Sequence, residues 1–238
     1  MDVDGRVHRL TYAKPLTVGP FAILPAFGTG HPLAAKVFIT GRRDANTVFM
    51  ADNVQIGRRL DIDFQGKGNV VFISKGVSFF ATKLMLRHDD NLILIGPDCR
   101  LKTPTLFADG PRASIVLGTG VTFESGVMIA QEPDLHISIG DDGMLSHDVA
   151  LRTSDSHGIQ DLATGQRINP PGPIELAAHV WLGNSARIGK GVVVGTNTVI
   201  AQRALLVADA EANSIYGGVP ARKIKSGVTW TRAMDTPL

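Results

Sequence analysis

The second half of the chain carries an aliphatic residue at every sixth position, and a small or β-branched residue follows each of them four positions later. The aliphatic series is Leu176, Leu182, Ile188, Val194, Ile200 and Leu206. The series four positions later is Val180, Ala186, Val192, Thr198, Ala204 and Ala210. This regularity predicts that both series face one continuous core.

A step of six fits neither a regular helix nor a flat strand. Six residues of helix turn through about 600°, which spreads the positions around the helix, and a flat strand alternates every two residues. A chain that makes a short strand and then a turn every six residues puts one aliphatic side chain per strand on an inner axis. Three such strands close a triangular coil of about 18 residues, which must stack on neighbouring coils to bury its apolar side. The pattern therefore predicts an all-β fold, a parallel β-helix of hexapeptide repeats.

The same step can be followed earlier in the chain, with less regular residues. Cys99 falls in a small inward position and is predicted to be a buried packing residue. The repeats between about 54 and 94 are blurred. The inward series predicted for the earlier half is Ile95, Leu101, Phe107, Ile115, Val121, Val127, Pro133, Ile139, Leu145 and Leu151.

The two repeat blocks are out of register, so residues have been inserted between them. Steps of six from Leu151 reach 175, whereas the second block begins at Leu176. The intervening segment, 157–175, is rich in glycine and proline and fits neither a helix nor a central strand. We expect an external loop with a binding or catalytic role, since long irregular excursions in compact domains are usually functional.

The repeats also suggest how the chain is divided. Residues 1–50 show no step of six and are predicted to form an N-terminal cap or extra strands. The β-helix is expected over 51–216, with the external loop 157–175 within it. A short C-terminal tail is expected over 217–238, because Gly217, Gly218 and Pro220 break the repeat.

Composition narrows the classes of function. The formal net charge is only +2 and the basic residues are scattered, which gives no support to nucleic-acid binding. A single cysteine leaves no pair for a disulfide or a thiolate zinc site. No apolar run approaches the length of a membrane span, and the first residues lack the order of a signal peptide, so a cytoplasmic location is expected.

Three motifs carry a resemblance to a known family. They are Thr153-Ser154-Asp155-Ser156-His157, His179-Val180-Trp181-Leu182-Gly183 and Gly218-Val219-Pro220-Ala221-Arg222-Lys223-Ile224. With these, the chain resembles the hexapeptide-repeat acyltransferases over about 95–225, particularly the sugar and capsular polysaccharide O-acetyltransferases. The resemblance implies a left-handed β-helix, assembled as a homotrimer with active sites between subunits. It implies an enzyme that transfers acetyl from acetyl-CoA to a hydroxyl of a sugar or polysaccharide, without a metal.

The resemblance also assigns catalytic positions. His157 matches the general base, and a neutral imidazole suits the removal of a proton from a hydroxyl near pH 7. Asp155 either orients or stabilises that imidazole, or caps a turn. The region of Trp181 is expected to stabilise charge on the thioester oxygen through indole or main-chain N–H groups, unless Trp181 only packs.

Further matching positions are expected to contact acetyl-CoA. Gly183, Asn184, Ala201 and Gln202 occupy them, although relatives often have Gly-Ala-Gly where this chain has Ala201-Gln202-Arg203. Arg222 and Lys225 match basic positions near the CoA phosphates, or belong to a solvated tail.

Other functions stay open at this point. An N-acetyltransferase acting on an amino sugar nucleotide or a serine O-acetyltransferase would look alike on the donor side. A zinc carbonic anhydrase of the same fold would need three histidines meeting between subunits, and a non-catalytic β-helix would need no histidine in the loop. The acceptor is not specified, but residues in and beside the loop are candidates to contact a sugar: Arg152, Gln160, Asp161, Arg167 and Asn169.

Overall fold

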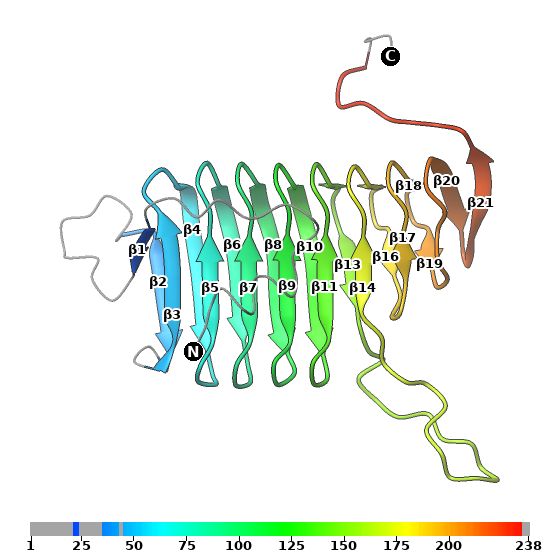
Figure 1. Cartoon of the computed structure of the whole chain (residues 1–238), viewed down its shortest axis with the longest axis horizontal. Coiled ribbons are helices and arrows are strands. Elements are labelled where there is room, and N and C mark those ends of the chain that lie inside the picture. The colour runs from blue at the N-terminus through cyan, green and yellow to red at the C-terminus, as the bar shows by residue number, and fades with distance from the viewer. Residues whose placement is uncertain (1–20, 24–34, 43–44, 235–238) are drawn as a thin grey trace.

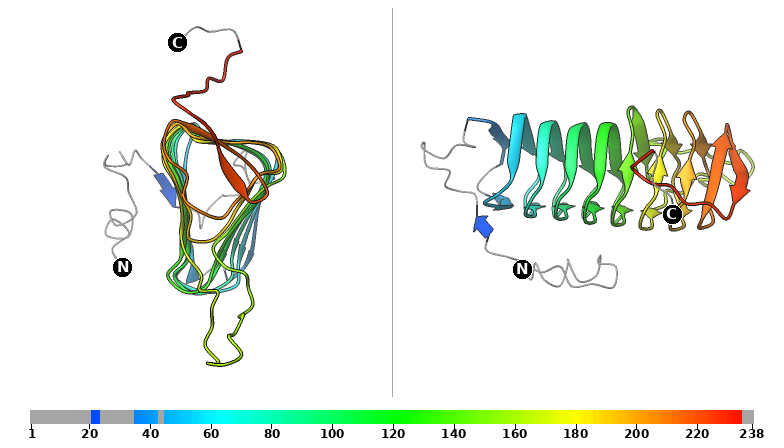
Figure 2. Two further views of the ribbon diagram at one scale, coloured as in Figure 1. Left: turned by 90° about the vertical axis from the view of Figure 1, so that its right-hand side faces the viewer. Right: turned by 90° about the horizontal axis from the view of Figure 1, so that it is seen from above.

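The computed structural model describes residues 21–23, 35–42 and 45–234. Over these residues the chain winds as a three-sided coil whose turns stack along one axis (Figure 1), and the view along that axis shows the triangular outline (Figure 2). All the secondary-structure elements described are strands. The predicted all-β parallel β-helix is confirmed.

The first face of the coil is an eight-stranded sheet, parallel except where β1 runs antiparallel to β3. Its strands are β1 (Phe21–Ile23), β3 (Thr47–Ala51), β5 (Val70–Ile73), β7 (Leu92–Ile95), β9 (Ser114–Leu117), β11 (His136–Ile139), β14 (Ile174–Leu176) and β17 (Val193–Val194).

The second and third faces share a 13-stranded sheet, because the long strands bend around the corner between these faces. The start of β10 (Thr122–Gln131) pairs with β12 on the second face, and its end pairs with β13 on the third. The other strands of this sheet are β2 (Val37–Gly41), β4 (Gln55–Phe64), β6 (Ser78–Leu86), β8 (Arg100–Asp109), β12 (Met144–Leu145), β13 (Val149–Arg152), β15 (Trp181–Leu182), β16 (Arg187–Ile188), β18 (Val199–Ile200), β19 (Leu205–Leu206), β20 (Ser214–Gly218) and β21 (Ala221–Ser226).

The coils are of two lengths. In the C-terminal half, Leu176 lies beside Val194, 18 positions later, as the step of six predicts. In the N-terminal half, Ile93, Ile115 and Ile137 are aligned neighbours at intervals of 22. Each longer coil gains its extra residues in the long bent strand, which explains why the hexads there are blurred.

The longer coils correct part of the predicted core. Phe107, Val127 and Pro133 do not lie in it; Leu106 and Met128 are the fully buried residues. In an extended strand the side chains alternate every two residues, so the step of six fails beyond the corner. The other predicted positions in the earlier half, Cys99 included, are buried, as are both series of the C-terminal half.

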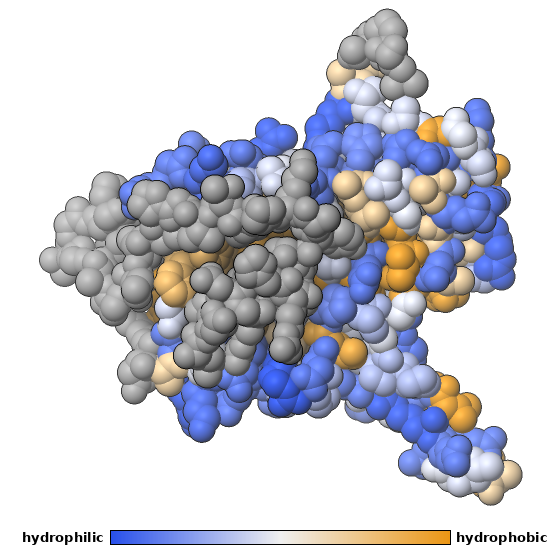
Figure 3. Space-filling view, viewed as in Figure 1, coloured by the Kyte–Doolittle hydropathy of each residue, from blue (hydrophilic) through white to orange (hydrophobic). Residues whose placement is uncertain are grey.

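The chain leaves the coil after β13 and returns at β14, which pairs with β11 although Ile137 and Ile174 are 37 positions apart. The intervening segment projects from the corner between the third and first faces (Figure 2). It is a narrow hairpin, held by an antiparallel bridge between Gln160 and Arg167. The loop surface in Figure 3 is mainly hydrophilic, with exposed apolar side chains at Ile159, Leu162 and Ile168.

The two ends of the chain differ in how much is described. Most of the predicted N-terminal cap, 1–50, lies outside the described residues. Of its described strands, β1 and β3 belong to the eight-stranded sheet and β2 belongs to the 13-stranded sheet. At the C-terminal end, β20 and β21 form an antiparallel hairpin. The described residues include no helix long and apolar enough to cross a bilayer.

Candidate active site

His157 lies at the start of the projecting loop, where the chain turns away from the third face. The turn uses Ser156 in the left-handed region at φ 65°, and the Ser156 amide donates to Ser154 Oγ over 3.0 Å. The His157 side chain is exposed. Within the described part of the chain the imidazole makes no hydrogen bond or ion pair, so both ring nitrogens are open to a substrate.

Asp155 does not hydrogen-bond to His157. Its Oδ2 accepts a hydrogen bond of 2.8 Å from Asn169 Nδ2 and forms an ion pair with Lys190. The hydrogen bonds from Lys190 and then Asn169 lower the pKa of the Asp155 carboxyl, which is therefore ionised at neutral pH. The link to His157 is indirect, because Asn169 Nδ2 also donates to the His157 carbonyl oxygen over 2.9 Å.

Asn169 is the central residue of the loop base. It is buried, and its Oδ1 accepts from the Ile159 amide over 2.7 Å and from Arg167 Nε over 3.2 Å. Asn169 was predicted to contact a sugar. In the structure its side chain is buried and its polar atoms are already hydrogen-bonded within the protein. This structural role could not be read from the sequence, because its partners surround it only after the loop has folded back.

Arg167 anchors the other side of the loop base. Its guanidinium makes a bidentate ion pair with Glu132 on the preceding coil: Nη1 donates to Oε2 over 2.9 Å and Nη2 donates to Oε1 over 2.8 Å. The hydrogen bonds from Arg167 and then from Ser154 lower the pKa of Glu132 to about 2. Sequence reasoning missed Glu132, because 35 positions separate it from Arg167 and nothing local marks the pair.

The predicted donor-side residues form a second group, around the corner between the second and third faces. Trp181 lies on the second face between Met144 and Val199. A Cβ on Gly183 would lie 2.7 Å from the Gln202 amide nitrogen, so only glycine lets these turns stack so closely. The Asn184 carbonyl accepts from the Arg203 amide over 2.8 Å. The structure thus brings Gly183, Asn184, Ala201 and Gln202 together.

The two predicted basic residues lie farther along the axis, on β21. Arg222 donates to its own neighbour, the Ala221 carbonyl, over 3.0 Å, and Lys225 lies beside Ile215. Both side chains are exposed. They are on the hairpin that follows the donor-side turns. Neither forms an ion pair with another described residue.

The two groups are not adjacent within one chain. His157 belongs to the corner between the third and first faces, whereas Gly183 and Asn184 belong to the corner between the second and third, and β16 crosses the third face between them. Within one chain, the width of one face therefore separates the predicted base from the predicted donor-side residues.

Trp181 has a neighbour that sequence reasoning missed. The Trp230 ring, in the C-terminal tail, lies 6.0 Å from the Trp181 ring at 51° and stacks on His179 at 4.0 Å and 6°. His179 is bound on both sides, by Asp142 over 2.6 Å and by the Trp230 carbonyl over 2.9 Å. Burial raises the pKa of Asp142, but hydrogen bonds from His179 and Arg232 outweigh it, and the pKa lies below its usual value. His179 is thus a docking point for the tail.

Within the described residues, no group of three or more His, Cys, Asp and Glu side chains is arranged to hold a metal ion.

No protein-family model matches the chain. Among curated proteins it is similar to the polysialic acid O-acetyltransferase of Escherichia coli O1:K1, with 28% identity over 120 residues, which cover 50% of this chain and 39% of that protein. It is also similar to the polysialic acid O-acetyltransferase of Neisseria meningitidis, with 29% identity over 53% of this chain and 68% of that one. The chain thus spans less than half the length of the first of these relatives.

Solved structures agree on the fold. The polySia-specific acetyltransferase NeuO superposes with a TM-score of 0.73 and 23% identity over 86% of each chain. The polysialic acid O-acetyltransferase OatWY gives 0.67 and 24% over 84% of this chain and 92% of that one. The chain is similar to hexapeptide-repeat O-acetyltransferases in sequence and in fold.

The likeness to these O-acetyltransferases covers most of the coil, not only the motifs around His157 and Trp181. A further relative, the galactoside O-acetyltransferase of Escherichia coli K12, is 25% identical over 55% of this chain and 62% of its own. The O-acetyltransferase relatives are therefore named for acceptors that differ in charge, a polymer of acidic sugars and a neutral sugar.

Proposed function

We propose that the protein is an O-acetyltransferase that moves an acetyl group from acetyl-CoA to a hydroxyl of a polysaccharide. The observation that carries the proposal is His157, an exposed imidazole with no partner among the described residues, held at the start of an anchored loop. The polysialic acid O-acetyltransferases to which the chain is similar support the reaction class.

The chemistry follows from the pKa of imidazole. Neutral His157 accepts the proton of the acceptor hydroxyl as its oxygen attacks the thioester carbonyl carbon. The new C–O bond forms a tetrahedral intermediate, whose collapse breaks the C–S bond and releases the CoA thiolate. The imidazolium then returns the proton to that thiolate, which gives CoA thiol and the acetyl ester.

The residues at the loop base act through His157. Asn169 holds the His157 carbonyl, and Asp155 holds Asn169 while paired with Lys190. These contacts fix the backbone that carries the base, so they favour a defined approach to the acceptor. The Asp155 carboxylate also stabilises the charged imidazolium electrostatically, without a direct hydrogen bond to it.

The donor would bind at the other corner, on a neighbouring copy of the chain. Within one chain, a face of the coil lies between His157 and the group of Trp181, Gly183, Asn184, Ala201 and Gln202. A homotrimer in which the loop of one subunit reaches the donor corner of the next would join the two groups. The exposed Ile159, Leu162 and Ile168 support this arrangement, because an apolar loop surface gains by packing against a partner. Arg222 and Lys225 would then meet the CoA phosphates.

The test is thiol release from acetyl-CoA with a panel of oligosaccharides. His157→Ala, in protein shown to be folded, is expected to lose acceptor-dependent release by about 10² or more, the usual effect of removing a general base. His88→Ala is the matched control, because His88 is an exposed histidine on a distant coil. Undiminished release by His157→Ala would remove the assignment of the base.

Complementation tests the site between subunits. Gln202→Trp places a bulky ring where CoA is expected, and His157→Ala lacks the base, so each is expected to be inactive alone. Unfolded and refolded together, mixed trimers should recover activity at sites that combine one intact loop with one intact donor corner. No recovery would contradict a site shared by two chains.

A further inference from the structure

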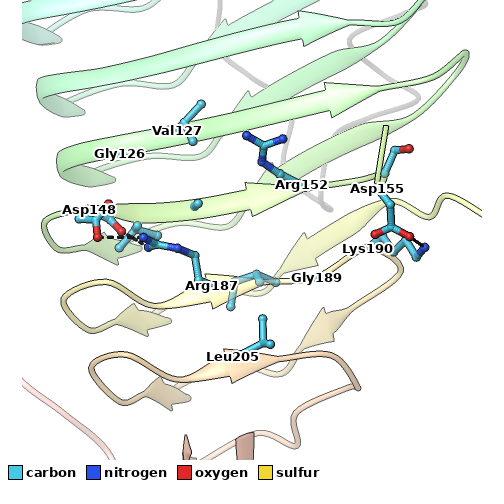
Figure 4. Close-up of a pocket in the computed structure, with 13 residues that line it drawn as sticks. Gly126, Val127, Asp148, Arg152, Asp155, Arg187, Gly189, Lys190 and Leu205 are labelled. Atoms are coloured by element: carbon cyan, nitrogen blue, oxygen red, sulfur yellow. Dashed lines mark hydrogen bonds and ion pairs between the residues drawn. The ribbon is translucent and has the colours of Figure 1, made fainter. Parts of the chain in front are cut away.

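The third face carries a groove beside the loop base. It has a volume of about 620 Å³ and lies over β13 and β16 (Figure 4). Val127, Ala150 and Leu205 give it an apolar floor, and Ser154 and Asp155 form the end nearest the loop. Since Asp155 is two residues before His157, the groove leads towards the predicted base.

Three cationic side chains line this groove, and two of them are neutralised. Arg187 pairs with Asp148 over 2.8 Å at one end, and Lys190 pairs with Asp155 at the other; Figure 4 draws both pairs as dashed lines. Arg152 lies between them and forms no ion pair or side-chain hydrogen bond with any residue that the structure describes. The groove therefore has one unpaired positive charge.

The surrounding residues leave space beside the Arg152 guanidinium. On the next coil, Ile188 is the partner of Leu151, so Gly189 is the residue beside Arg152 and contributes no side chain. Arg152 points outward because its neighbour Leu151 is buried in the core. The absent side chain at Gly189 and the apolar floor leave room for a ligand beside Arg152, whose own side chain is exposed.

A guanidinium presents a planar pair of N–H donors that matches the two oxygens of a carboxylate or phosphate. A neutral sugar offers no such group. The relatives are named for an acidic polymer in two cases and for a neutral sugar in another, so the comparisons alone leave the acceptor's charge open.

We propose that Arg152 binds an oxyanion group of the acceptor in the third-face groove, so that the acceptor is an acidic saccharide whose neighbouring unit presents its hydroxyl to His157. The inference rests on the proposed O-acetyl transfer and adds the chemical class of the acceptor. Arg152 is a specificity-determining residue, since it contacts the acceptor away from the reacting atoms.

The test measures binding directly, without acetyl-CoA. Sialic acid oligomers supply carboxylates, a glycerol phosphate oligomer supplies phosphodiesters, and a malto-oligosaccharide is the neutral probe. Arg152→Gln is expected to weaken binding of an oxyanion-bearing probe by about 10- to 100-fold, the effect of one charge-assisted hydrogen-bonded contact. Arg152→Lys should restore part of it, because it keeps the charge but not the planar fork. Arg58→Gln is the matched control, an exposed arginine on the distant strand β4.

The outcomes are distinct. Binding that depends on Arg152 for the sialic acid or the phosphate probe supports the proposal and identifies the oxyanion. Equal affinities of wild type and Arg152→Gln for every probe, or no binding of either acidic probe by wild type, would overturn it. Arg152-dependent binding without thiol release from acetyl-CoA would leave this inference standing and reject the proposed O-acetyl transfer.

Discussion

Three side chains hold the loop that carries His157: Arg167 and Asn169 of the loop itself, and Glu132 of the preceding coil. Glu132 and Arg167 make a planar, two-pronged ion pair, and Asn169 satisfies the backbone at both strands of the hairpin base. Such geometry is more specific than a single surface ion pair, since two parallel hydrogen bonds fix the orientation of both groups. At the scale of the residue, the position of the predicted base depends on residues that take no part in the proposed reaction.

The ion pair predicts a pH dependence. The pKa of Glu132 is lowered to about 2, so the attachment of the loop is complete above the ordinary value of 4.5 and is lost as the pH falls from there through about 2. In Arg167→Gln the pKa of Glu132 should rise towards its ordinary value, because Arg167 is the largest cause of the shift. A carbon-13 NMR titration of the Glu132 carboxyl measures this.

Arg112→Gln is the control for that titration. It removes an exposed ion pair with Asp134 and leaves Glu132 and its partners in place. An unchanged pKa of Glu132 in Arg167→Gln would show that the pair does not hold the loop in solution.

At the scale of the element, the short strands stabilise the fold only as a stack. β15, β16 and β19 are two residues each, of which one points inward, so each coil contributes a few aliphatic side chains to a core shared with its neighbours. The hydrogen bonds of each strand likewise go to the coils above and below. A defect in one coil is therefore felt by both adjoining coils.

This arrangement predicts unequal effects of two substitutions. Leu182→Ala, at a fully buried position, is expected to cost about 2–5 kcal/mol in the free energy of unfolding, through lost burial and the cavity left behind. Val193→Ala is the control, because Val193 is 47% exposed on the first face and should change the stability by less than about 0.5 kcal/mol. Urea unfolding at equal protein concentration compares them; equal losses would contradict the inward register.

The sequence predicted the C-terminal coils well, because there each strand and turn takes six residues and the period is visible directly. It failed at Phe107 and Val127, where a strand bends around a corner without a turn and alternation by two replaces the step of six, and at Pro133, which lies exposed in the turn after β10. His157 and the donor-side turns could be predicted from motifs. Glu132, Trp230 and the groove at Arg152 could not, since each depends on which coils become neighbours after folding.

At the scale of the whole molecule, the C-terminal tail ties distant coils together. After β21 it runs back along the corner between the first and second faces, where Trp230 covers His179 and Arg232 binds Asp142 over 2.9 Å and Thr122 over 3.0 Å. The Trp230 indole also donates to the His179 carbonyl over 2.8 Å. The tail thus contacts several coils along this corner, next to Trp181.

The docking of the tail predicts protection from trypsin at Arg232. In Trp230→Ala, loss of ring stacking and burial should expose Arg232 and raise the rate of cleavage there by about tenfold or more, since each 1.4 kcal/mol corresponds to a factor of about ten. Met234→Ala is the control, because that side chain is 99% exposed and makes no docking contact. Equal cleavage rates in the wild type and Trp230→Ala would mean that the tail is not docked.

The chain has only two tryptophans, and the fold brings their rings within 6.0 Å of each other. Two indoles at this separation interact as coupled transition dipoles, so their near-ultraviolet circular dichroism and emission depend on their mutual geometry. One indole belongs to the tail and the other to the donor-side corner. The protein therefore carries its own optical reporter: undocking the tail would move one chromophore, and a ligand at Trp181 would perturb the other, without any attached dye.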